Sequence, residues 1–323
     1  SGHGAALGDV LIRGEGIGCL AFVGGRTNGR KAATTLTDTG RRHFLEQEGL
    51  NAWGVWGFSQ WDLLAGHIKK GYEYGKQRCT AYPRFVVQRS LFADFLDAYL
   101  PVVASLKFGH PLAVDHEADP FPELDFGPVI SADKATELRM NFDEAVRSGG
   151  IPLVHRTLRD GRFIDAQDTS AYVAPACVLQ PPSSWVLHHK EPFGPLDSIV
   201  LVDTEAEMLA AMNASNGSLV ASIATDDSSL ADRVAEELQA FKIGINAPRS
   251  RGDREEVFGG RGASWKGAFV GGDLLVAAAL GRIDRFIRVF WSALVAVVGC
   301  IRVDHDLTHV LWAIRICRIR RFI

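Results

Sequence analysis

One cysteine of this chain lies in a setting that suits covalent chemistry. Cys79 follows Arg78 in segment 75–81, GKQRCTA, between an amphipathic stretch and a β-branched run. A neighbouring cation favours the thiolate, which is the nucleophilic form of cysteine. We therefore expect Cys79 to act as a nucleophile on a helix-to-strand connection, and the alternative for a lone cysteine is inert core packing.

More of the sequence follows one known pattern, in one order. The Cys79 segment is followed by FVVQR at 85–89, FGPVI at 126–130, EPFGP at 191–195 and FGG at 258–260. These motifs resemble those of the NAD(P)-dependent aldehyde dehydrogenases, and the match runs from about residue 2 to about residue 275. The resemblance implies an enzyme that oxidises an aldehyde to a carboxylic acid with NAD or NADP, through a cysteine thiohemiacetal and a thioester.

The resemblance also implies a glutamate as general base. Glu46 lies 33 residues before Cys79, about the interval between the family's base and its cysteine. Burial among apolar neighbours would raise the pKa of this carboxyl group, which suits a base for water near neutral pH. Glu48 stands where the family usually has glycine, and it remains a competing candidate. The alternative for Glu46 is a solvated glutamate at the end of a strand.

A glycine turn is the expected seat of the cofactor pyrophosphate. The expected strand 19–23 leads through Gly24 and Gly25 into a helix that we expect to begin near Arg30. Unpaired N–H groups and the dipole of a helix N-terminus favour anions. The family binds its pyrophosphate at this turn, and here Arg26 replaces a threonine. Arg26 would suit the extra phosphate of NADP, or else it is an exposed turn residue.

The motif EPFGP carries the other expected cofactor contacts. The resemblance implies that Glu191 binds the ribose hydroxyls beside nicotinamide and that Phe193 packs nearby. Two carboxylate oxygens suit a vicinal diol because both hydroxyls can donate to them. A loop glutamate without a function is the alternative.

Alternating strands and helices must position these residues. We expect helices at 61–74, 90–106, 131–146, 204–217 and 230–241, and strands at 85–88, 151–155, 171–179, 198–202, 218–225 and 242–246. This order predicts an α/β fold with a parallel sheet. With the resemblance it gives four parts: a partial Rossmann-like remnant of a cofactor domain at 1–46, an aldehyde dehydrogenase-type catalytic domain at 47–248, a return segment at 249–280 and an atypical tail at 281–323.

Composition narrows the class of protein. The chain has 323 residues, 47% of them hydrophobic, and a net charge of -3, which gives no electrostatic footprint for nucleic acid. Its five cysteines are odd in number and free of C-x-x-C pairs, which argues against a disulfide framework and a zinc site. We therefore expect no metal and a cytoplasmic location. The resemblance implies a homo-oligomer for a full-length form.

The last part of the chain departs from the rest. Residues 281–323 contain eight arginines around an apolar run of thirteen residues, fewer than the roughly 20 that span a bilayer. A membrane-surface helix and a misread coding frame are both open for this tail. The chain also begins with Ser1 and not with methionine, so a processed protein or a fragment is expected. A non-catalytic truncated paralogue, acting if at all by binding a partner, is the alternative function.

Overall fold

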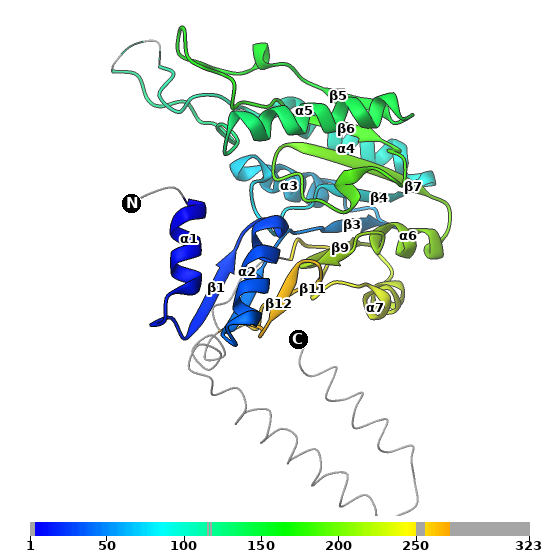
Figure 1. Cartoon of the computed structure of the whole chain (residues 1–323). Coiled ribbons are helices and arrows are strands. Elements are labelled where there is room, and N and C mark those ends of the chain that lie inside the picture. The colour runs from blue at the N-terminus through cyan, green and yellow to red at the C-terminus, as the bar shows by residue number, and fades with distance from the viewer. Residues whose placement is uncertain (1–3, 115, 117, 250–255, 272–323) are drawn as a thin grey trace, which may run out of the picture.

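A seven-stranded sheet forms the centre of the protein (Figure 1). The computed structural model describes residues 4–114, 116, 118–249 and 256–271. The strand order is β10-β9-β3-β4-β7-β6-β5, and neighbours are parallel except for β5 and β6. The strands are β3 (Ala52–Val55), β4 (Arg84–Gln88), β5 (Ile151–His155), β6 (Ala176–Leu179), β7 (Leu196–Val202), β9 (Val220–Ala224) and β10 (Lys242–Ile245).

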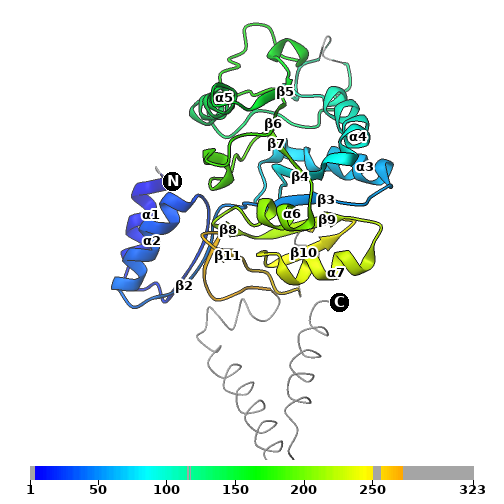
Figure 2. The ribbon, with the colours of Figure 1, turned by 90° about the vertical axis from the view of Figure 1, so that its right-hand side faces the viewer.

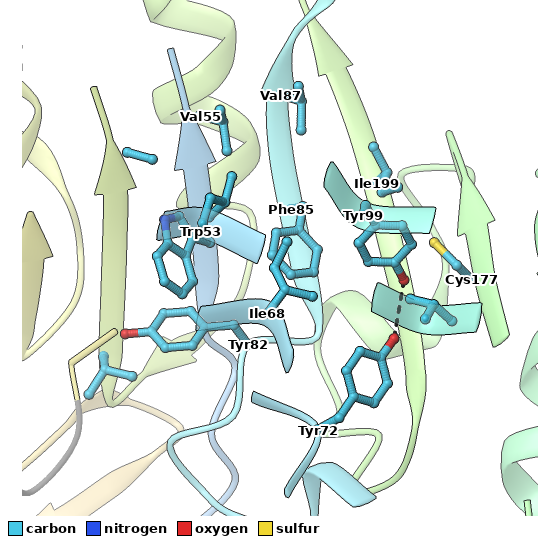
Figure 3. Close-up of a cluster of buried hydrophobic side chains, with 14 of the residues drawn as sticks. Trp53, Val55, Ile68, Tyr72, Tyr82, Phe85, Val87, Tyr99, Cys177 and Ile199 are labelled. Atoms are coloured by element: carbon cyan, nitrogen blue, oxygen red, sulfur yellow. Dashed lines mark hydrogen bonds between the residues drawn. The ribbon is translucent and has the colours of Figure 1, made fainter. Parts of the chain in front are cut away.

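Helices cover both faces of this sheet (Figure 2). One face carries α3 (Trp61–Gly71) and α4 (Phe92–Ser105), and the other carries α5 (Ala132–Arg147), α6 (Glu205–Met212) and α7 (Ser228–Glu237). Strand β4 has apolar side chains on both faces, so both faces must be covered. Phe85 and Val87 pack into the core beneath α3 and α4, whereas Val86 packs beneath α6 and α7. Parallel strands that are buried on both faces read as continuous apolar runs. Figure 3 shows the first of these cores, in which Trp53 and Tyr82 lie beside Phe85.

A smaller sheet lies beside the large one and carries the N-terminal part of the chain. Its order is β1 (Cys19–Val23), β2 (Arg42–Glu46) and β12 (Trp265–Gly267), with β12 antiparallel to β2. Helices α1 (Gly4–Arg13) and α2 (Arg26–Asp38) pack together against one face of it (Figure 2). A separate pair joins β8 (Gly217–Ser218) to β11 (Arg261–Gly262). Short 3₁₀ helices occur at Glu73–Lys76 (η1), Arg89–Leu91 (η2), Leu158–Asp160 (η3) and Val186–His188 (η4).

The α/β fold with a largely parallel sheet confirms the expectation from the sequence, but several boundaries were wrong: the helices expected at 61–74 and 230–241, for example, are Trp61–Gly71 and Ser228–Glu237. Helix α2 begins at Arg26 and not near Arg30, because Gly29 is a packing glycine inside the helix: a Cβ there would lie 2.9 Å from Gln47. The strand expected at 171–179 begins only after Pro175, which has no N–H for the ladder. Helix α6 ends at Met212, where Asn213 bonds to the end of α7.

Some expectations fall on residues that the structure does not describe. The tail at 281–323 lies outside the described residues, as do 250–255 and 272–280 of the return segment. Within the described ranges, no helix combines the length and the apolar character needed to cross a membrane.

Candidate active site

Cys79 lies on the connection from η1 to β4, as expected, and an asparagine holds its backbone. Asn51 is fully buried, and its Nδ2 donates to the carbonyl oxygens of Cys79 and Ala81, both at 2.8 Å. Its Oδ1 accepts the N–H groups of Leu219 at 3.3 Å and Val220 at 3.1 Å. Because every polar atom of this amide is used, the Cys79 backbone is tied to β9.

Gly49 allows the chain to pass directly against this cysteine. A Cβ atom at Gly49 would lie 1.7 Å from the Cys79 carbonyl oxygen and 3.0 Å from Asn51. The obstacle is backbone, so no side-chain rotation relieves it. Our sequence reasoning missed both Gly49 and Asn51. The available signal was a glycine and an amide residue between a strand-end glutamate and an apolar strand.

Glu46 ends β2 and lies beside the Cys79 thiol. Burial raises the pKa of this thiol well above its usual value. The negative charge of Glu46, and the hydrogen bond that its carboxylate accepts from the thiol, raise the pKa further. The negative charge of Glu191 raises it as well, by less than that of Glu46. The resting thiol is therefore protonated.

The expectation that Arg78 favours the thiolate was wrong. Its Nη2 donates to the carbonyl oxygens of Lys70 at 3.2 Å and Gly71 at 3.3 Å, and its Nη1 lies 3.8 Å from Glu73. The guanidinium is thus bound to the end of α3. Because Arg78 is next to Cys79 in the sequence, we expected its charge to act on the thiol, but its side chain points toward the end of α3 instead.

Removing the charge of Glu46 should make Cys79 more reactive toward a small alkylating agent. In Glu46→Gln the thiol loses a neighbouring negative charge, so its pKa falls and the thiolate fraction at pH 8 rises. Since each pKa unit is a factor of ten in that fraction, we expect iodoacetamide to modify Cys79 about tenfold faster. Mass spectrometry of the Cys79 peptide measures this rate. Glu48→Gln is the matched control, and an unchanged or slower rate in Glu46→Gln would contradict the assignment.

Glu48, the competing candidate, has a different position. Its Oε1 accepts the Arg26 N–H at 3.2 Å, and its Oε2 accepts the Glu191 N–H at 3.3 Å. This carboxylate therefore joins the first turn of α2 to the Glu191 loop. Of the two glutamates, Glu46 is the one whose charge and hydrogen bond act on the Cys79 thiol.

The glycine turn lies next to Glu46 at the start of α2. The Gly24 N–H donates to the Glu46 carbonyl oxygen at 3.1 Å. Gly25 is the N-cap without a side-chain hydrogen bond, and a Cβ there would meet nothing within 4 Å. Arg26 Nη1 is buried and has no hydrogen-bond partner among the described residues. A glycine N-cap beside an unpaired guanidinium nitrogen fits a phosphate group, which would compete with Glu48 for the Arg26 N–H.

Glu191 and Phe193 lie on the loop before β7. Burial raises the pKa of the Glu191 carboxyl group well above its usual range, the charges of Glu48 and Glu46 raise it as well, and a hydrogen bond from the Gly49 backbone opposes them. Phe193 adopts a left-handed backbone with a φ of 50°, a conformation that non-glycine residues rarely take. The electrostatic influence of Glu46 and Glu191 on Cys79 shows that these three residues lie close together.

In the described ranges, no group of three or more His, Cys, Asp or Glu residues is arranged to hold a metal ion.

Comparison with known proteins shows the family to which this chain belongs. The model of the aldehyde dehydrogenase family matches residues 1–278. The chain belongs to the aldehyde dehydrogenase family. Related members include the alpha-ketoglutarate semialdehyde dehydrogenase of Haloferax volcanii, 26% identical over 80% of this chain and 52% of that protein. The N-succinylglutamate 5-semialdehyde dehydrogenase 1 of Caulobacter vibrioides is 28% identical over 81% of this chain and 52% of its own length.

Solved aldehyde dehydrogenase structures share the fold. The lactaldehyde dehydrogenase of Escherichia coli superimposes with a TM-score of 0.74 at 21% identity, over 85% of this chain and 55% of that chain. The NADP-dependent glyceraldehyde-3-phosphate dehydrogenase of Bacillus halodurans, complexed with NADP, gives 0.70 at 25% identity, over 87% and 54%. This aldehyde dehydrogenase-family chain therefore spans about half the length of the relatives it matches.

Proposed function

We propose that this chain carries the catalytic part of an NAD(P)-dependent aldehyde dehydrogenase. The observation that carries the proposal is the position of the Glu46 carboxylate, which acts on the Cys79 thiol and lies next to the Gly24–Gly25 turn. A thiol and a base in contact can supply nucleophilic catalysis followed by hydrolysis. The family match favours this enzyme over the non-catalytic alternative.

The residues of this chain divide the reaction between them. Cys79 gives up its proton to solvent, its Sγ bonds as the thiolate to the aldehyde carbonyl carbon, and the Cys79 backbone N–H is the donor for the developing oxyanion. NAD(P), when bound, supplies the acceptor for the hydride that converts the thiohemiacetal into a thioester. Glu46 then takes a proton from the water that attacks the thioester. The products are a carboxylic acid and the free thiol.

The cofactor contacts are part of the proposal. Gly24 and Gly25 would hold the pyrophosphate, while Glu191 and Phe193 would hold the ribose and nicotinamide side. The open turn, the unpaired Arg26 Nη1 and the NADP complex of the Bacillus halodurans relative support NAD or NADP at this place.

A division into domains follows from the same contacts. We assign residues 1–46 and the returning strand β12 to the cofactor side and residues 47–248 to the catalytic side, because β12 pairs with β2 within the smaller sheet. A small-molecule aldehyde, a homo-oligomer of the full-length form and no nucleic acid complete the proposal. A cytoplasmic location suits the free thiols of Cys19, Cys79 and Cys177.

A pre-steady-state measurement tests the role of Glu46. In Glu46→Gln, deacylation should slow far more than hydride transfer, because the variant lacks the base for water but keeps the nucleophile. Stopped-flow absorbance with an aldehyde should show a burst of reduced cofactor and then a steady rate lower by about 10²–10⁴. In Glu48→Gln the burst should be absent. If Glu48→Gln gives the burst and Glu46→Gln does not, the two roles must be exchanged.

A further inference from the structure

A buried lysine closes the segment that carries Cys79. Lys76 lies three residues before the cysteine, and only 4% of its surface is exposed. Its Nζ donates to the Tyr82 carbonyl oxygen at 3.1 Å and to Asp197 Oδ1 at 2.5 Å. The ammonium group therefore joins the two ends of segment 76–82, with Cys79 at its middle.

Asp197 anchors this lysine to the large sheet and two helices. The residue lies on β7 and is fully buried. Its Oδ2 accepts the hydroxyl groups of Tyr72 at 2.7 Å and Tyr99 at 2.9 Å. Figure 3 shows the two tyrosines with their hydroxyls facing each other, 3.2 Å apart. Both charges are thus paired, and both carboxylate oxygens are bonded, as a buried ion pair requires.

The backbone before Cys79 is held in a conformation that it would not adopt alone. Tyr74, Gly75 and Lys76 have consecutive φ angles of 58°, 62° and 58°. The left-handed region is unfavourable for non-glycine residues and persists where the surroundings determine it. The Lys76 ammonium also lies 4.3 Å from the centre of the Tyr72 ring. The buried contacts of Lys76 oppose the relaxation of this turn.

We propose that the Lys76–Asp197 ion pair is the positioning element for Cys79, and that it holds the thiol against Glu46. Lys76 does not take part in the chemistry; it fixes both ends of the segment from which the thiol projects. The inference rests on the proposed function only in the role given to Cys79. Its test needs neither an aldehyde nor a dinucleotide, so a failure of the proposed activity leaves it measurable.

The test compares the Glu46→Gln effect on Cys79 in two backgrounds. The first is the wild-type chain, and the second is Lys76→Met with Asp197→Asn, which removes both charges and leaves no unpaired buried ion. The readout is the pH profile of iodoacetamide modification of Cys79, with Cys19 in the same chain as internal reference. Lys69→Met with Asp125→Asn is the matched control, since it removes a partly exposed pair of 2.8 Å between α3 and a loop.

A positioning role predicts that the coupling between Glu46 and Cys79 is lost. Glu46→Gln should speed modification about tenfold at pH 8 in the wild-type and control backgrounds, and less than about twofold in the Lys76→Met background. The midpoint of the Cys79 profile should also fall in that background even with Glu46 present. Equal effects of Glu46→Gln in all backgrounds would overturn the proposal.

A second variant covers the case in which Lys76→Met with Asp197→Asn does not fold. Lys76→Gly with Asp197→Asn lacks both charges, and glycine adopts a φ of about +60° without strain. The same comparison is then made in this background, after circular dichroism has established the fold. If neither double variant folds, the pair is a folding element and the positioning role is rejected.

Discussion

Replacing Cys79 with alanine should abolish aldehyde-dependent reduction of NAD(P) in a catalytically active form of the protein. The variant has no thiol to form the thiohemiacetal, so hydride transfer has no adduct from which to start. We expect kcat/KM to fall by more than about 10³-fold, as is usual when a nucleophile is removed. The measurement is the initial rate of absorbance change at 340 nm over a series of aldehyde concentrations.

Controls separate this result from a loss of structure. Cys19→Ala should keep full activity, because this partly buried cysteine lies on β1 away from Glu46. Alkylation that an aldehyde prevents should occur in wild type and be absent in Cys79→Ala. Turnover that survives in Cys79→Ala would remove Cys79 from the mechanism.

Replacing Gly49 with alanine should have a similarly large effect through geometry alone. The new methyl group would lie 1.7 Å from the Cys79 carbonyl oxygen, and backbone must shift to make room. A displacement of about 1 Å at a reacting group costs on the order of 10²-fold in rate. We expect kcat to fall by at least about 10²-fold and the free energy of unfolding to fall by about 3 kcal/mol. Steady-state kinetics and urea unfolding measure the two quantities.

Gly66 provides the control for Gly49. A Cβ there would meet nothing within 4 Å, and the residue lies inside α3. Gly66→Ala should therefore leave activity unchanged and stabilise the protein by up to about 1 kcal/mol, the helix preference of alanine over glycine. If Gly49→Ala behaves like Gly66→Ala, the close approach of Gly49 to Cys79 does not constrain the site.

The sequence predicted those parts of the fold that depend on local pattern. The apolar runs gave most strands, and the Ser131 cap gave the start of α5 correctly, since its hydroxyl accepts the Lys134 N–H at 3.1 Å. These features depend on neighbours in sequence. The start of α2 was placed too late because the sequence does not distinguish a glycine that precedes a helix from one that packs inside it, as Gly29 does against Gln47.

The candidate site also has residues that sequence motifs predicted and partners that they did not. The spacing of known motifs brought Cys79, Glu46 and Glu191 to attention, and the structure places them together. The partners that fix them come from far away in the chain. Asn51 reaches Leu219, and Lys76 reaches Asp197, across 168 and 121 residues. No local pattern reports such pairs, and the direction of Arg78 was misjudged for the same reason.

The Glu48 carboxylate links two regions that would otherwise act independently. It accepts the first N–H of α2 with one oxygen and the Glu191 N–H with the other. An anion that binds the Arg26 N–H must compete with the Glu48 carboxylate for it. When Glu48 is displaced, the Glu191 N–H also loses its hydrogen-bond acceptor. Linkage is reciprocal, so a rearrangement of the Glu191 loop changes the affinity of α2 for anions by the same factor. The N-terminus of α2 and the Glu191 loop therefore share the Glu48 carboxylate, and an anion bound at the helix changes the conformational freedom of the loop.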